Sequence, residues 1–161
     1  MVEIFSVENL ETFWQLFLAV VLGGAIGMER ELARKTAGMR TFALVSMGAA
    51  LFSIVSRANS ISALGATNFD PTRIAAQIVT GIGFLGAGLI IFREDKLRGL
   101  TTAAGLWVTA GIGMAVGFGL YTIAIFGTVL IIVVLLVFWQ VERKLVRRMP
   151  HPYDEAADED N

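Results

Sequence analysis

Apolar residues follow one another along this chain in five long blocks that lack the regular polar positions of an amphipathic helix. Each block approaches the roughly 20 mostly apolar residues that an α-helix needs to cross a bilayer. A helix of a soluble bundle would need a charged face, and none of the five blocks has one. We therefore predict an all-α, polytopic membrane protein with five transmembrane helices, at about 10–28, 39–55, 73–92, 100–117 and 119–140.

The composition agrees with this interpretation. Of the 161 residues, 55% are hydrophobic and only 17% are charged, whereas soluble domains are about 45–50% apolar and about 25% charged. The mean hydropathy is +0.68. The chain has no cysteine and a single histidine, His151, which excludes disulfides, thiolate metal sites and cysteine nucleophiles.

The charged residues predict an orientation in the membrane. If five helices alternate, eleven of the thirteen Lys and Arg residues fall on one side, and only Arg57 and Arg73 fall on the other. The positive-inside rule then places the N-terminus outside and the C-terminus in the cytoplasm. We expect residues 1–9 to form a short N-terminal segment, and residues 141–161 to form a cytoplasmic tail that is first basic and then acidic.

Glycines are frequent in the predicted helices. The third helix contains a G-x-G-x-x-G pattern, but the pattern lies inside an apolar block, and a dinucleotide site would need a preceding strand. Small residues allow membrane helices to approach one another closely. We therefore assign helix packing, within or between chains, to Gly23, Gly27, Gly81, Gly83, Gly86, Gly88, Gly113 and Gly117.

A polar stripe enters the bilayer at the start of the third helix. Asp70 suits a helix N-cap, while Arg73, Gln77 and Thr80 share one helical face. Buried polar groups are expensive in a membrane and usually face the bundle or a wet cavity. Thr80 could bond to its own backbone, whereas Gln77 could serve either interhelical hydrogen bonding or a functional site.

Two loops carry further polar candidates. Glu29 and Arg30 close the first predicted helix, and Arg40 and Thr41, at the start of the second, could meet Glu29 across the short loop. An exposed ion pair there would contribute little to stability. The other loop contains Arg98, Thr101 and Thr102, which predict a turn at the arginine followed by hydroxyl caps from the two threonines.

Four segments together resemble the N-terminal membrane domain of the MgtC/SapB family, also called the magnesium transporter-C family. They are residues 23–31 (GGAIGMERE), 38–45 (GMRTFALV), 70–88 (DPTRIAAQIVTGIGFLGAG) and 98–107 (RGLTTAAGLW). Each motif is weak alone, but their order and spacing over residues 10–140 are specific.

The resemblance implies a multi-pass protein of the bacterial inner membrane, tied to Mg²⁺ homeostasis and growth under low-Mg²⁺ stress. It suggests Mg²⁺ as the one cofactor to consider, and the membrane ATP synthase as a protein partner. The better-known virulence members carry a soluble C-terminal domain, whereas about twenty residues follow the last predicted helix here. We therefore do not carry over functions that depend on that domain.

Two functional hypotheses remain. The favoured one is a regulator of membrane partners, acting through helix contacts in the lipid bilayer, with no nucleic-acid partner. A homodimer is a separate expectation, and a dimer would also make an ion path more plausible than a monomer would. The alternative is a transporter or channel for Mg²⁺ or another small ion, which could use oxygen ligands from Glu29, Asp70, Gln77 and Thr80. Glu29 and Asp70 could not share one ion, because they should lie at opposite faces of the membrane. No nucleophile–base pair or cofactor motif indicates an enzyme.

Overall fold

The computed structural model describes residues 7–62, 72–93 and 96–146, and the predicted all-α architecture with five helices is confirmed in this part of the chain. A short two-stranded hairpin is the one addition among the described residues. The elements in chain order are α1 (Val7–Leu32), α2 (Met39–Ser62), α3 (Thr72–Leu89), β1 (Ile91–Arg93), β2 (Lys96–Arg98), α4 (Leu100–Gly117) and α5 (Tyr121–Val146).

Four of the helices, α1, α2, α4 and α5, are long and apolar enough to cross a membrane. The fifth, α3, has 18 residues, which corresponds to a length of about 27 Å against a hydrocarbon core of about 30 Å. Its apolar portion, Arg73–Leu89, is correspondingly shorter. The chain is therefore a multi-pass α-helical membrane protein, while the predicted orientation, with the N-terminus outside, stays a prediction.

The helix bounds differ from the sequence expectation mainly at the charged ends. α1 continues past Met28 to Leu32 and α2 continues past Val55 to Ser62, because charged or polar residues end an apolar run without ending a helix. α5 likewise runs to Val146, into the segment expected to be a tail. The third helix ends earlier than expected, at Leu89, because residues 91–93 and 96–98 pair as antiparallel strands.

Gly99 connects the hairpin to α4. Its φ of 92° lies in the left-handed region, which glycine adopts without steric cost. A Cβ at this position would lie 2.0 Å from the carbonyl oxygen of Leu89. Gly99 is also the N-cap of α4 and makes no side-chain cap bond, so the expected hydroxyl caps from Thr101 and Thr102 are wrong.

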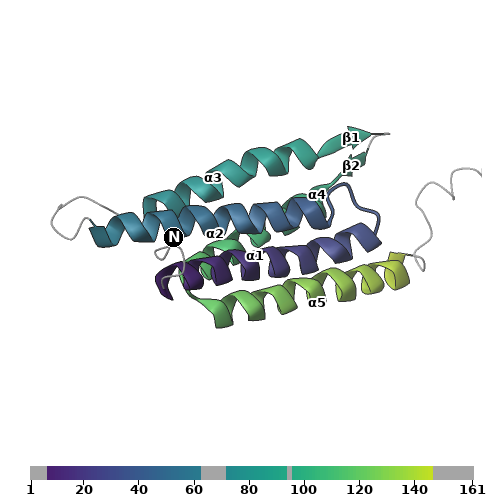
Figure 1. Ribbon diagram of the computed structural model, residues 1–161. Helices are drawn as coiled ribbons and strands as arrows, with labels where there is room; N and C mark the ends of the chain where they lie inside the picture. Colours follow the sequence, from purple (N-terminus) through teal and green to yellow (C-terminus); the bar gives the residue numbers. More distant parts are fainter. Residues whose placement is uncertain (1–6, 63–71, 94–95, 147–161) are drawn as a thin grey trace, which may run out of the picture. The chain divides into compact units, whose positions relative to one another are not determined.

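The described residues divide into two compact units, one up to Ile131 and one from Ile132 onward, with the boundary inside α5. In the first unit, α1, α2 and α4 pack against one another (Figure 1). In the second, the guanidinium carbon of Arg143 lies 5.0 Å from the centre of the Trp139 ring, a cation–π contact within α5.

Within the first unit, glycines bring α1, α2 and α4 together. A Cβ at Gly23 would lie 2.6 Å from the Phe42 carbonyl oxygen in α2, and one at Gly27 would lie 2.6 Å from the Met39 Cα. On α4, a Cβ at Gly113 would lie 2.1 Å from the Ser46 carbonyl oxygen. α2 therefore packs backbone against backbone with both of its neighbours, as small residues permit in membrane helices.

Candidate functional site

The outward face of α3 carries a row of small residues. Ala76, Thr80, Gly83 and Ala87 recur at intervals of four, three and four residues, so they lie along one face of the helix. All four are exposed, and a Cβ at Gly83 would meet nothing within 4 Å. Phe84, beside this row, is 82% exposed. We call Ala76, Thr80, Gly83 and Ala87 the small-residue stripe.

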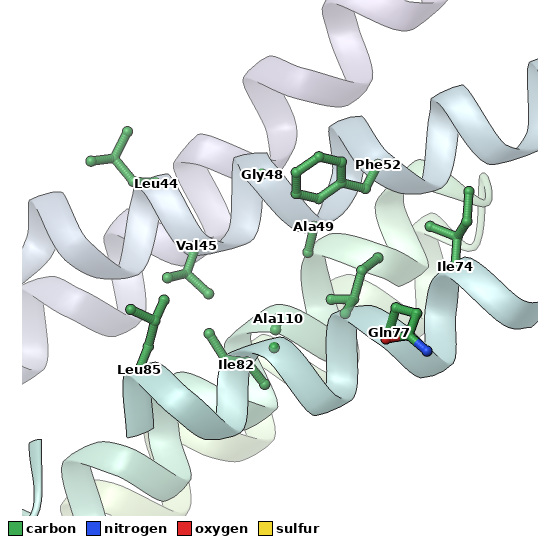
Figure 2. A pocket seen from close by; sticks show the side chains of 12 residues that line it. Leu44, Val45, Gly48, Ala49, Phe52, Ile74, Gln77, Ile82, Leu85 and Ala110 are labelled. Carbon is green, nitrogen blue, oxygen red and sulfur yellow. The ribbon is translucent and has the colours of Figure 1, made fainter. Parts of the chain in front are cut away.

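The other face of α3 borders a groove of about 550 Å³ between α2 and α3, with one contribution from α4 (Figure 2). Ile74 and Gln77 lie at one end of the groove with Phe52 of α2, and Leu85 lies at the other end with Val45. Gln77 is the only side chain with a hydrogen-bonding group among the lining residues, which are Leu44, Val45, Gly48, Ala49, Phe52, Ile74, Gln77, Ile78, Gly81, Ile82, Leu85 and Ala110.

The predicted polar stripe of α3 divides into two parts in the structure. The Thr80 hydroxyl donates to the carbonyl oxygen of Ala76, 3.0 Å away in the same helix, so it satisfies its own hydrogen bond. Gln77 is exposed, and its amide has no hydrogen-bond partner among the described residues. Arg73 is also exposed and lies one helical turn before Gln77. Among the described residues, Arg73 and Gln77 are therefore the exposed polar side chains of this stripe that make no bond within the helix.

A buried polar cluster, which sequence reasoning missed, joins α1, α2 and α5. Gln15 is fully buried, and its amide nitrogen donates to the Tyr121 hydroxyl at 2.9 Å. The Arg57 guanidinium donates to the Gln15 amide oxygen at 3.4 Å, and the Tyr121 hydroxyl donates to the Glu11 carboxylate at 3.3 Å. The isolated glutamine within the first apolar block was the available signal, because a membrane helix rarely buries an unpaired amide.

The charged side chains at the end of α1 form a different ion pair from the one expected across the α1–α2 loop. The Glu29 carboxylate accepts hydrogen bonds from the neighbouring Arg30, one of them at 2.7 Å, while Arg40 and Thr41 are exposed. Arg30 itself is only 2% exposed. Glu29 is therefore paired within its own helix, and the predicted contact across the loop is not the one that forms.

Glu31 supplies a contact that the sequence analysis did not single out. Its carboxylate accepts a hydrogen bond from the Met39 backbone amide at 3.0 Å. This interaction satisfies one of the free amide groups at the start of α2. The α1–α2 loop is thus organised by Glu31, and by the Arg30–Glu29 pair.

The remaining candidates lie apart from the groove. Thr102 is buried on α4, whereas Thr101 and Arg98 are exposed. Asp70 lies outside the described residues, so its predicted capping role is not described. Among the described residues, no group of three or more His, Cys, Asp or Glu side chains gathers in a way that could hold a metal ion.

The glycines assigned to helix packing fall into two sets. Gly23, Gly27, Gly113 and Gly117 lie against neighbouring helices so closely that a Cβ would come within 2.6 Å of another atom. Around Gly81, Gly83 and Gly88, by contrast, a Cβ would meet nothing within 4 Å. Gly86 is intermediate, because its Cβ would lie 3.8 Å from the Ala103 side chain.

Four long apolar helices and a shorter one define a multi-pass α-helical membrane protein. The MgtC family profile matches residues 16–144. The chain therefore belongs to the MgtC family. No solved structure matches it.

The chain is similar to several curated relatives. It is 49% identical over 139 residues to YhiD of Escherichia coli strain K12, whose name marks it as a proposed magnesium transporter, covering 85% of this chain and 65% of YhiD. It is 48% identical over 116 residues to the protein MgtC of Brucella abortus strain 2308, covering 72% of this chain and 46% of that protein. The chain thus spans less than two thirds of the length of each.

Proposed function

We propose that this chain is a bacterial inner-membrane protein of Mg²⁺ homeostasis that supports adaptation to low Mg²⁺ by regulating membrane partners, without catalysing a reaction. Membership of the MgtC family and the names of two relatives, MgtC and a proposed magnesium transporter, support the connection with Mg²⁺. The distribution of charged residues along the chain supports the predicted orientation, with the N-terminus outside and the C-terminus in the cytoplasm.

The observation that carries the regulatory proposal is the small-residue stripe of α3. Lipid tails do not require small side chains, whereas close helix–helix contact does. The stripe is exposed in the chain, and Gly83 at its centre has open space around it. A transmembrane helix of another protein can therefore approach α3 closely along this stripe.

The partner we propose is a membrane protein that presents one helix to the stripe. The resemblance to MgtC/SapB proteins makes the membrane ATP synthase the first protein to test. A second copy of this chain, which would make a homodimer, could use the same face. The two differ in the crosslinked species that they yield, because a homodimer crosslinks to a product of twice the mass of the chain.

The test is crosslinking and purification from bacteria grown at low Mg²⁺, with the full chain carrying an affinity tag. Gly83→Leu fills the stripe, and Gly81→Leu serves as the matched control, because position 81 lies on the groove side of the same helix and is equally open. We expect the wild type and Gly81→Leu to recover the same membrane partner and Gly83→Leu to lose it. Failure of the wild type to recover any membrane protein would count against the proposal.

The name of YhiD supports transport of Mg²⁺ as a second function. Gln77 is the residue that a flux experiment should change, because it brings an amide to the apolar groove. The purified chain in proteoliposomes would take up Mg²⁺ if it were a transporter, and Gln77→Leu would reduce the uptake. The regulatory proposal expects no Mg²⁺ flux above that of empty liposomes.

A further inference from the structure

Two glycines face the groove between α2 and α3 from opposite sides. Gly48 belongs to α2 and Gly81 to α3, and both line the groove. A Cβ at either position would meet nothing within 4 Å. Neither glycine therefore brings helices together within the chain, in contrast to Gly23 or Gly113. Their effect is to widen the groove.

The groove is polar at one end only. From Ile74 to Leu85 it follows α3 for about 17 Å, and along this length the other lining side chains are apolar or absent. Gln77 lies near the Ile74 end (Figure 2), and Arg73 precedes Ile74 at the start of the helix. Because Arg73 and Gln77 are four residues apart, their side chains leave the helix on the same side.

The position of Arg73 along α3 fits the membrane interface. The helix is about 27 Å long, close to the hydrocarbon thickness, so a residue at its first turn lies near the lipid headgroups. Gln77 lies about 6 Å deeper along the helix axis. An arginine guanidinium binds phosphate by paired hydrogen bonds, and an amide can donate to an ester carbonyl oxygen just below it.

We propose that this groove binds a phospholipid with an anionic headgroup. Its phosphate pairs with Arg73, a glycerol ester accepts a hydrogen bond from the Gln77 amide, and one acyl chain runs past Gly81 toward Leu85. An amphiphile has one polar end and a long apolar chain. It therefore matches this groove, which is polar near Gln77 and apolar along the rest of its length. A second protein helix would instead favour the small-residue stripe, where close backbone approach is open along four positions.

The experiment uses the full chain, purified in detergent, stripped of native lipid, and titrated with dipalmitoyl phosphatidylglycerol in native mass spectrometry. Gly81→Leu fills the groove, and Gly83→Leu places the same side chain on the other face of the same helix. Arg73→Gln removes the charge that binds phosphate. Dipalmitoylglycerol, which has the same chains and no phosphate, separates chain binding from headgroup binding. Gly48→Leu fills the groove from α2 and replaces Gly81→Leu if that variant unfolds.

We expect Gly81→Leu to weaken phosphatidylglycerol binding about tenfold, and Arg73→Gln to weaken it by a similar factor, as loss of one charge-assisted hydrogen bond would. Gly83→Leu should bind as the wild type does, and Arg73→Gln should leave dipalmitoylglycerol binding unchanged. Equal loss in Gly81→Leu and Gly83→Leu, or undiminished phosphatidylglycerol binding in Arg73→Gln, would overturn the proposal.

Discussion

Glycine has opposite uses in two regions of this protein. In the bundle of α1, α2 and α4, Gly23, Gly113 and Gly117 let backbones touch, and an added Cβ would come within 2.6 Å of another helix. On α3, an added Cβ at Gly81 or Gly83 would meet nothing within 4 Å. The same residue type therefore builds a scaffold in the first region and leaves free surface in the second.

The difference indicates where contacts with other molecules form. The three-helix bundle uses Gly23, Gly27, Gly113 and Gly117 internally, so substitution at these four positions should act through stability. α3 presents its small residues outward, on the small-residue stripe and along the groove, so substitution there should act through binding. Pairs of matched variants can therefore separate structural from functional effects within one chain.

The largest difference should come from adding one methyl group in each region. Gly113→Ala forces a Cβ to within 2.1 Å of the Ser46 carbonyl oxygen, and we expect it to destabilise the fold by about 3 kcal/mol. Gly83→Ala meets no neighbour and should be neutral, or stabilising by up to about 1 kcal/mol because alanine favours helices. Reversible unfolding in mixed micelles measures the free energy of unfolding of each variant. Equal stability of the two variants would erase the contrast between the regions.

Gly99→Ala tests the connection between the hairpin that follows α3 and the start of α4. The φ of 92° and the 2.0 Å approach to the Leu89 carbonyl oxygen both disfavour a side chain, so we expect a loss of about 2 kcal/mol. The midpoint of thermal unfolding in detergent should fall. An unchanged midpoint would show that this turn relaxes without cost.

Tyr121→Phe removes the hydroxyl that accepts from the Gln15 amide and donates to Glu11. Since interhelical hydrogen bonds in membrane proteins contribute modestly, we expect a loss of about 1 kcal/mol, measured by unfolding in mixed micelles. Gln15→Leu should cost less in the Tyr121→Phe background than in the wild type, because the bond between the two residues is already lost there, while the bond from Arg57 to Gln15 is lost in both backgrounds. Full additivity of the two losses would contradict the proposed coupling.

The smallest effect is expected at Thr80. Its hydroxyl bonds to the Ala76 carbonyl oxygen of the same helix, and a carbonyl already within a helix does not need that second donor. Thr80→Val should therefore change the free energy of unfolding by less than about 0.5 kcal/mol. A larger loss would show that Thr80 has a structural role beyond the bond to its own helix.

Much of the fold follows from local properties of the sequence. Blocks of apolar residues predict five helices because crossing a bilayer requires satisfied backbone groups over a fixed length. The helix ends were less predictable, since Glu29 and Arg30 end the apolar run but continue α1 to Leu32. The strand pair at residues 91–93 and 96–98 was missed, because each strand is too short to show a repeating pattern.

The site was predictable only in part. Gln77 and Arg73 stand out in the sequence because polar side chains are rare in membrane helices. Which glycines touch another helix depends on which helices pack together, and spacing along the chain does not contain that information. Gln15 was overlooked for the same reason, because its partners Tyr121 and Arg57 belong to other helices.

Photo-crosslinking from α3 in living bacteria tests most directly whether this helix has two binding faces. A photoreactive amino acid would replace Gly83 in one variant and Gly81 in another, because both positions have open space. In cells grown at low Mg²⁺, we expect position 83 to crosslink to a membrane protein and position 81 to crosslink to phospholipid. If both positions yielded the same adduct, α3 would not present two distinct binding faces, and the proposed division between protein and lipid contacts would be contradicted.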